Sequence, residues 1–293
     1  MTYPGFADFT APARPTSELW RTLSGILLVT VIYAGGAAGI IAAGTFALQV
    51  SGIGTAGDVL TGRTPPALLL VLFHFIAMAA AAIVVTRLLH QRGGWTLLGD
   101  RNRLWADFRR MALIAVVVGV VGAAVFAAIM DIAWKLPFST WLLYLPFALP
   151  LILLQTGAEE LVFRGYLLQQ FGARFGVAAR AAWMIIPSLI FAAAHTDPAS
   201  QGGNWWAVVA ITFAFAMVAS DITARTGSLG AAWGLHFINN CQAILIFSLA
   251  GPLSGLSLGS VGIPASAPAA LPLIGIDAVA LALIYLIWRR RYG

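Results

Sequence analysis

The clearest capacity for chemistry in this sequence lies in two glutamates and two histidines placed within otherwise apolar segments. Glu159 and Glu160 are adjacent in one such segment, and His195 closes another. His236 stands four residues before Asn240 in a third. A carboxylate beside an imidazole in an apolar pocket is a good base for taking a proton from water. A histidine with an asparagine can donate hydrogen bonds to an oxyanion, so the set predicts amide hydrolysis by activated water.

A zinc ion is the alternative way to activate that water. Its ligands would be the same residues, namely Glu159, His195, His236 and Asn240. The sequence has no His-Glu-x-x-His zinc motif, and asparagine is a better oxyanion donor than zinc ligand. Cys241 is the only cysteine, which excludes a disulfide within the chain and a cysteine-based cluster. We therefore favour a site without a cofactor and keep zinc as the alternative.

Helical spacing separates supporting residues from the reacting ones. Glu160 and Arg164 are four residues apart and share a helix face, so we expect them to pair. Glu159 is turned about 100° from Glu160 and can point at a cavity instead. Phe191 precedes His195 by four residues, which lets its ring pack beside the imidazole.

The elements that position these groups are membrane-spanning helices. The chain of 293 residues is 60% hydrophobic and 10% charged, whereas a soluble domain carries about 25% charged residues. A span needs about 20 mainly apolar residues. Eight segments qualify: 23–50, 66–89, 110–133, 139–172, 178–196, 205–223, 227–250 and 270–288. The predicted fold class is all-α, a polytopic membrane helix bundle of about eight transmembrane helices.

The predicted organisation is a short N-terminal tail, residues 1–22, followed by a single membrane domain, residues 23–293. The fourth span is too long for a simple crossing, so we expect it to continue as an amphipathic helix through Arg164 and Gln170. The Gly-, Ser- and Pro-rich stretch 251–272 predicts an ordinary outer loop, with a re-entrant segment as the alternative.

Arginines between the spans give the chain an orientation. One set of alternate loops is rich in basic residues, which are Arg92, Arg101, Arg103, Arg109, Arg110, Arg174, Arg180, Arg225, Arg289, Arg290 and Arg291. The opposite loops hold only Arg63 and Lys135. The positive-inside rule then places both termini in the cytoplasm. Basic clusters flanking spans argue against nucleic-acid binding, and the Arg-rich, Lys-poor composition indicates a bacterial inner membrane.

Depth in the membrane brings the polar residues together. With a rise of about 1.5 Å per residue, Glu159 lies roughly 20 Å from the cytoplasmic end of its helix and His195 roughly 25 Å. His236 lies roughly 14 Å inward and Asn240 roughly 20 Å. One helix running inward and two running outward thus predict a single pocket.

These three motifs resemble the signature of the CAAX protease and bacteriocin-processing family, which includes the type II CAAX prenyl endopeptidases. The motifs are Glu159-Glu160-x-x-x-Arg164, Phe191-x-x-x-His195 and His236-x-x-x-Asn240, within a core at about 142–246. The resemblance implies a glutamate-dependent intramembrane endopeptidase, although the family is often grouped with the metalloendopeptidases. It also implies that Glu159 and His195 activate water, that His236 and Asn240 stabilise the oxyanion, and that Glu160, Arg164 and Phe191 support them.

Partners follow from this interpretation: a peptide or protein substrate at the membrane, the lipid bilayer, and no nucleic acid. Two alternatives stay open. One is a non-catalytic membrane factor, such as a bacteriocin-immunity or partner-binding protein. The other is a proton-coupled transporter that uses Glu159, His195 and His74 as a relay. A packing hydrogen bond is the simpler interpretation of His74 and of Asp277, each a single polar residue in a span.

Overall fold

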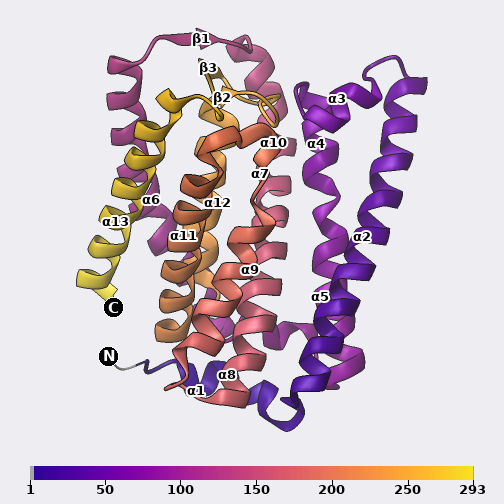
Figure 1. The fold of residues 1–293 in the computed structure, drawn as a ribbon, viewed down its shortest axis with the longest axis vertical. Coiled ribbons are helices and arrows are strands. Elements are labelled where there is room, and N and C mark those ends of the chain that lie inside the picture. The colour runs from indigo at the N-terminus through magenta and orange to yellow at the C-terminus, as the bar shows by residue number, and fades with distance from the viewer. Residues whose placement is uncertain (1–2, 293) are drawn as a thin grey trace.

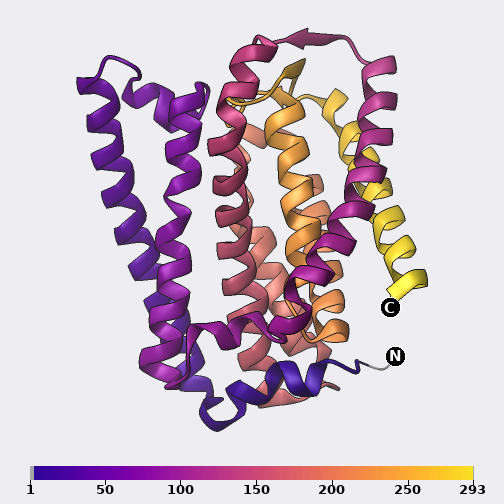
Figure 2. The same ribbon diagram turned by 180° about the vertical axis from the view of Figure 1, so that it is seen from behind.

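The computed structural model describes residues 3–292 and is a bundle of upright helices (Figures 1 and 2). The helices that build the bundle are α2 (Leu19–Val50), α4 (Pro65–Phe73), α5 (Phe75–His90), α6 (Arg101–Ile129), α7 (Phe138–Glu160), α8 (Gln169–Phe175), α9 (Ile186–Ala194), α11 (Trp205–Thr226), α12 (Gly230–Cys241) and α13 (Leu271–Tyr292). The predicted helical membrane bundle is therefore confirmed.

Six helical segments among the described residues are long and apolar enough to cross a membrane: Leu19–Val50, Pro65–His90, Arg101–Ile129, Phe138–Phe175, Pro198–Thr226 and Pro268–Tyr292. The fifth and seventh predicted spans are helical but shorter. The fifth runs over Ala181–Ala194, and the seventh comprises α12 and a π-helical turn that ends at Ile246. The predicted count of eight spans is thus not confirmed by length and hydropathy.

Exposed tryptophans lie at both ends of the bundle, where a membrane protein meets the lipid headgroups. Trp20 begins α2, and Trp95 lies in the connection between α5 and α6. Trp134 belongs to β1 at the opposite end (Figure 1), and Trp205 and Trp206 begin α11. The apolar flanks between these two rims are largely exposed, which fits a bilayer and not water as the surrounding medium.

A small sheet caps the end of the bundle away from α1 (Figure 1). It has the order β1-β3-β2, formed by Ile132–Trp134, Gly259–Pro264 and Phe247–Ala250. Strand β3 lies where we predicted a loop, over 251–272, and β2 lies at the end of the span that we predicted up to residue 250. Strands this short show no clear periodicity in the sequence. The loop also folds inward, where the Leu253 amide donates to the carbonyl of Thr61, the last residue of α3 (Ala56–Thr61).

Residues 3–16 pack against one end of the bundle. Helix α1 (Phe6–Thr10) and the 3-10 turn after it (Ala11–Thr16) lie across the end of α8, and the Phe6 ring packs on Trp183. The Tyr3 hydroxyl donates to Asp221 at 3.0 Å, and the same carboxylate pairs with Arg225. Phenylalanines that bury against the helix ends account for this docking.

The chain from Phe138 to Phe175 is one continuous helical segment in which α7 passes through a π-helical stretch, Leu161–Leu168, into α8. The predicted amphipathic continuation is wrong, because both faces of residues 162–172 are buried and Gln170 is fully enclosed. His90, which ends α5, hydrogen-bonds the Tyr166 hydroxyl at 2.8 Å. The segment that follows Glu160 is therefore the central helix of the bundle.

Candidate active site

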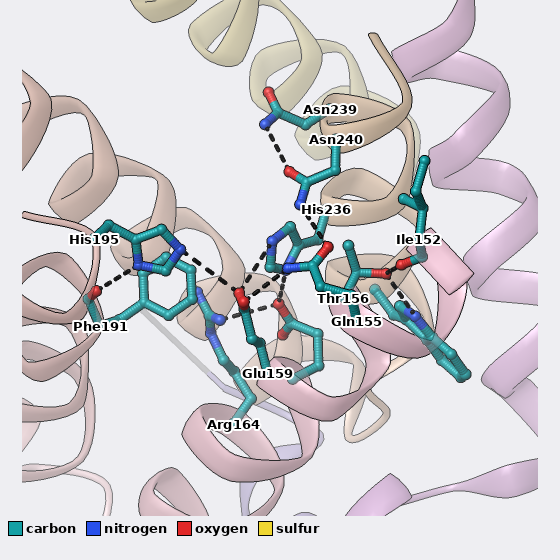
Figure 3. A network of polar contacts seen from close by, with 12 residues as sticks. Ile152, Gln155, Thr156, Glu159, Arg164, Phe191, His195, His236, Asn239 and Asn240 are labelled. Carbon is teal, nitrogen blue, oxygen red and sulfur yellow. Dashed lines mark hydrogen bonds and ion pairs between the residues drawn. The ribbon is translucent and has the colours of Figure 1, made fainter. Parts of the chain in front are cut away.

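Three helices meet at the polar cluster drawn in Figure 3. The end of α7 supplies Glu159 and Glu160, the residue after α9 is His195, and the middle of α12 supplies His236. The depth argument predicted this meeting, and the side chains are in contact range. Figure 3 also shows the Phe191 carbonyl beside His195 and the Asn240 amide above His236.

One oxygen of Glu159 is the focus of both imidazoles. Its Oε2 atom lies 3.7 Å from Nε2 of His195 and 3.4 Å from Nε2 of His236. Glu159 is buried, and this oxygen has no hydrogen-bond partner among the described residues. Both separations exceed a normal direct hydrogen bond.

In each ring, the hydrogen bond made by Nδ1 shows which nitrogen carries the proton. Nδ1 of His195 lies 2.8 Å from the carbonyl oxygen of Phe191, which can only accept, so this nitrogen donates. Nδ1 of His236 lies 2.8 Å from Oε1 of Glu160, and a carboxylate again assigns the proton to Nδ1. In their neutral forms both rings therefore present an unprotonated Nε2 to Glu159.

Glu160 has two partners, of which the spacing predicted one. Its Oε1 accepts from Arg164 at 2.9 Å, as expected for residues four apart. It also accepts from His236, which is 76 residues distant in sequence and was not foreseen as a partner. Glu160 and Arg164 are 0% and 1% exposed, so this is a fully buried ion pair. Through its bond to Nδ1, Glu160 holds the His236 ring with Nε2 toward Glu159.

Aromatic rings enclose the charged groups. Phe191 packs on His195 with ring centroids 4.3 Å apart, as the spacing of the two residues predicted. The guanidinium carbon of Arg164 lies 4.6 Å from the Phe191 ring centre and 5.9 Å from that of Phe215. These contacts keep the cation in place through cation–π attraction.

Asn240 joins the cluster through a residue that the sequence argument did not select. Its Nδ2 donates to Oε1 of Gln155 at 2.8 Å, and Nε2 of Gln155 donates to Oε1 of Glu159 at 2.7 Å. Gln155 is four residues before Glu159 on the same helix, so helical spacing could have identified it. Asn239, by contrast, is exposed and contacts only the Asn240 side chain among the site residues.

His74 lies in another span and has a hydrogen-bond partner outside this cluster. The Tyr33 hydroxyl is 2.9 Å from Nε2 of His74, and Nδ1 of His74 meets the Val71 carbonyl oxygen. The Tyr33 ring also stacks on the imidazole. This is the packing hydrogen bond that we expected between spans.

No group of three His, Cys, Asp or Glu side chains among residues 3–292 has an arrangement that could hold a metal ion.

The site opens on the side of His195. Its side chain is 36% exposed, whereas that of His236 is 3% exposed and that of Glu159 is 6% exposed. The neighbouring face of α9 presents Leu189 and Ile190 to the surroundings. An apolar helix face thus adjoins the open side of the cluster.

Comparison with known proteins places the same region in a family. A model of the type II CAAX prenyl endopeptidase Rce1-like family matches residues 139–242, which include every residue of the cluster. The resemblance read from the three motifs is thereby confirmed over that region, about a third of the chain.

One curated relative is the uncharacterized protein YyaK of Bacillus subtilis strain 168. It is 38% identical over 94 residues, a match that covers 32% of this chain and 30% of that protein. The similarity is therefore confined to under a third of the relative's length. No solved structure gives a significant match.

Proposed function

We propose that this chain, whose residues 139–242 match the type II CAAX prenyl endopeptidases, is an intramembrane endopeptidase that hydrolyses a peptide bond with water activated by Glu159 and His195. The observation that carries the proposal is the convergence of two imidazole nitrogens on one buried oxygen of Glu159. Three helices contribute these groups, so the convergence requires the whole bundle. A carboxylate and an imidazole at this separation form a proton acceptor for one water molecule.

The nucleophile fits between Glu159 and His195. A carboxylate oxygen and an unprotonated nitrogen both accept, and their 3.7 Å separation suits one water that donates a hydrogen to each. The lone pair of that water is then directed away from both groups, toward a carbonyl carbon presented from the open side at His195. Burial of Glu159 favours proton transfer from the water as its oxygen attacks.

His236 and Asn240 are the proposed oxyanion donors. His236 lies between the carboxylates of Glu159 and Glu160, and the only buried cation beside them is Arg164 among the described residues of the cluster. A protonated His236 makes this group of four charges neutral, which lowers the cost of burying them. Its Nε2–H can then donate to the oxyanion together with an N–H of Asn240.

Collapse of the tetrahedral intermediate completes the reaction. The oxyanion re-forms a carbonyl, the carbon–nitrogen bond breaks, and Glu159 returns the water proton to the leaving amine. His195 holds the second hydrogen of the attacking water and passes it on when the new carboxyl group ionises. The products are a carboxylate and an amine, and Glu159 ends as the carboxylate that began the cycle.

The substrate class is a peptide or protein segment that approaches from the bilayer on the α9 side. The basic loops lie at the end of the bundle that carries α1, and the positive-inside rule gives that end as cytoplasmic. We extend this to a multi-pass protein of a bacterial inner membrane with both termini in the cytoplasm. No nucleic acid takes part.

The test uses purified protein in detergent and a pool of internally quenched peptides with a randomised scissile segment, including a farnesylated CAAX peptide as a separate arm. Glu159→Gln removes the base and is expected to lower kcat at least about 10³-fold while the melting temperature stays the same. Asp277→Asn, a change of a carboxylate on the exposed face of α13, is the matched control. Cleavage at the wild-type rate by the Glu159→Gln protein would refute the mechanism.

A further inference from the structure

Among residues 3–292, Gln155 is the one buried amide that bonds to both Glu159 and Asn240. It lies on α7 one turn before Glu159 and is buried. Its Nε2 donates to Oε1 of Glu159 at 2.7 Å, and its Oε1 accepts from Nδ2 of Asn240 at 2.8 Å. Both distances are typical of well-formed hydrogen bonds. The amide therefore connects the base on α7 with the amide donor on α12.

The charge on Glu159 determines which way this amide faces. An ionised carboxylate only accepts hydrogen bonds, so the N–H side of Gln155 must turn toward it and the carbonyl side must turn toward α12. That carbonyl in turn accepts from the NH₂ group of Asn240. The contact of the Asn239 Nδ2 atom with Oδ1 of Asn240, at 3.3 Å, matches the same orientation of Asn240.

The orientation matters because an oxyanion needs a donor. The Asn240 amide has two N–H groups, of which Gln155 accepts one, so the second is free for a substrate oxygen. If the amide were reversed, Asn240 would present its carbonyl oxygen to an oxyanion and repel it. Gln155 prevents this reversal only while its own N–H side stays on Glu159.

We propose that Gln155 is a positioning residue that holds Asn240 in its donor orientation and holds the Glu159 carboxylate in place through its bond to Oε1. The inference rests on the proposed hydrolytic function and adds a residue outside the three motifs. It acts through two neighbours and does not itself take part in bond making or breaking. Loss of Gln155 then lowers kcat and leaves KM nearly unchanged.

Two substitutions separate the two bonds. Gln155→Leu removes both, and kcat is expected to fall about 10–100-fold, less than the loss of a whole oxyanion donor. Its KM should stay within about 3-fold, because uniform substrate binding is untouched. Gln155→Glu keeps an acceptor for Asn240 but sets a carboxylate against Glu159. Its kcat should therefore exceed that of Gln155→Leu and stay below that of the wild-type protein.

Gln170→Leu is the matched control, since Gln170 is an equally buried amide of the same helical segment with no hydrogen-bond partner among the described residues. It should leave kcat and KM unchanged. A double variant of Gln155→Leu with Asn240→Ala tests whether Gln155 acts through Asn240. If Gln155 acts through Asn240, the double variant has a plateau kcat no lower than Asn240→Ala alone.

Melting temperatures show whether each variant is folded, and the Gln155→Glu comparison remains informative if the Leu variant is unstable. The proposal is overturned if both Gln155 variants keep the wild-type kcat, or if the two losses in the double variant multiply. Failure of the proposed function looks different, because the wild-type protein would then cleave no peptide, or Glu159→Gln would cleave as fast as the wild type.

Discussion

Arg164→Met removes the cation from a fully buried ion pair and leaves the Glu160 carboxylate with His236 as its only partner among the described residues. Breaking such a pair by removing one member costs about 3–5 kcal/mol, because the remaining charge stays buried. The cation–π contacts with Phe191 and Phe215 are lost as well. At about 2–4 °C per kcal/mol for a chain of this order of size, Tm should fall by about 10 °C.

The assay is thermal unfolding in a single detergent, followed by intrinsic tryptophan fluorescence. The double variant of Glu160→Gln with Arg164→Met removes both charges and should recover more than half of the loss. Arg103→Met is the control, because Arg103 is half-exposed and its ion pair with Asp107 should contribute about 0–1 kcal/mol. The expectation is refuted if Arg164→Met has the melting temperature of the wild-type protein, or if the double variant is less stable than Arg164→Met alone.

Two further predictions concern metal and the N-terminal segment. Protein purified without added metal should contain substoichiometric zinc and keep its peptidase activity in a chelator; stoichiometric zinc that is lost together with activity would instead favour the zinc alternative. Gly5→Ala should lower Tm and speed proteolysis within residues 3–16, because a Cβ at Gly5 would lie 2.2 Å from the Gly227 backbone nitrogen. Gly39→Ala, where nothing lies within 4 Å of the new atom, is the control, and equal effects of the two changes would contradict the packing argument.

The sequence allowed the helices and the convergence of the motifs to be predicted, because both follow from local regularities. Apolar runs identify the spans, and a constant rise per residue turns a position in the chain into a depth. The pair of Glu160 with Arg164 and the packing of Phe191 on His195 follow from the four-residue spacing, and the structure contains both. These are contacts within one helical segment.

Contacts between helices were beyond such reasoning. The bond from Glu160 to His236 depends on how α12 is rotated against α7, and the sequence of either helix alone does not define that rotation. The bond from Asn240 to Gln155 was missed for the same reason. His90 comes directly before an arginine-rich loop, and the tertiary fold buries it against Tyr166, which is 76 residues away in the sequence. Each of these cases needs the relative placement of two elements that are distant in the chain.

The two histidines of the site have different surroundings and should respond differently to substitution. His236 is almost fully buried between two carboxylates, so His236→Gln should lower both kcat and Tm. The His195 side chain is 36% exposed and bonds only a backbone carbonyl through Nδ1, so His195→Gln should lower kcat with little change in Tm. Parallel kinetic and melting measurements on the two variants give the comparison. If both changes lowered Tm equally, the open side of the site would not lie at His195, and the direction proposed for substrate approach would be wrong.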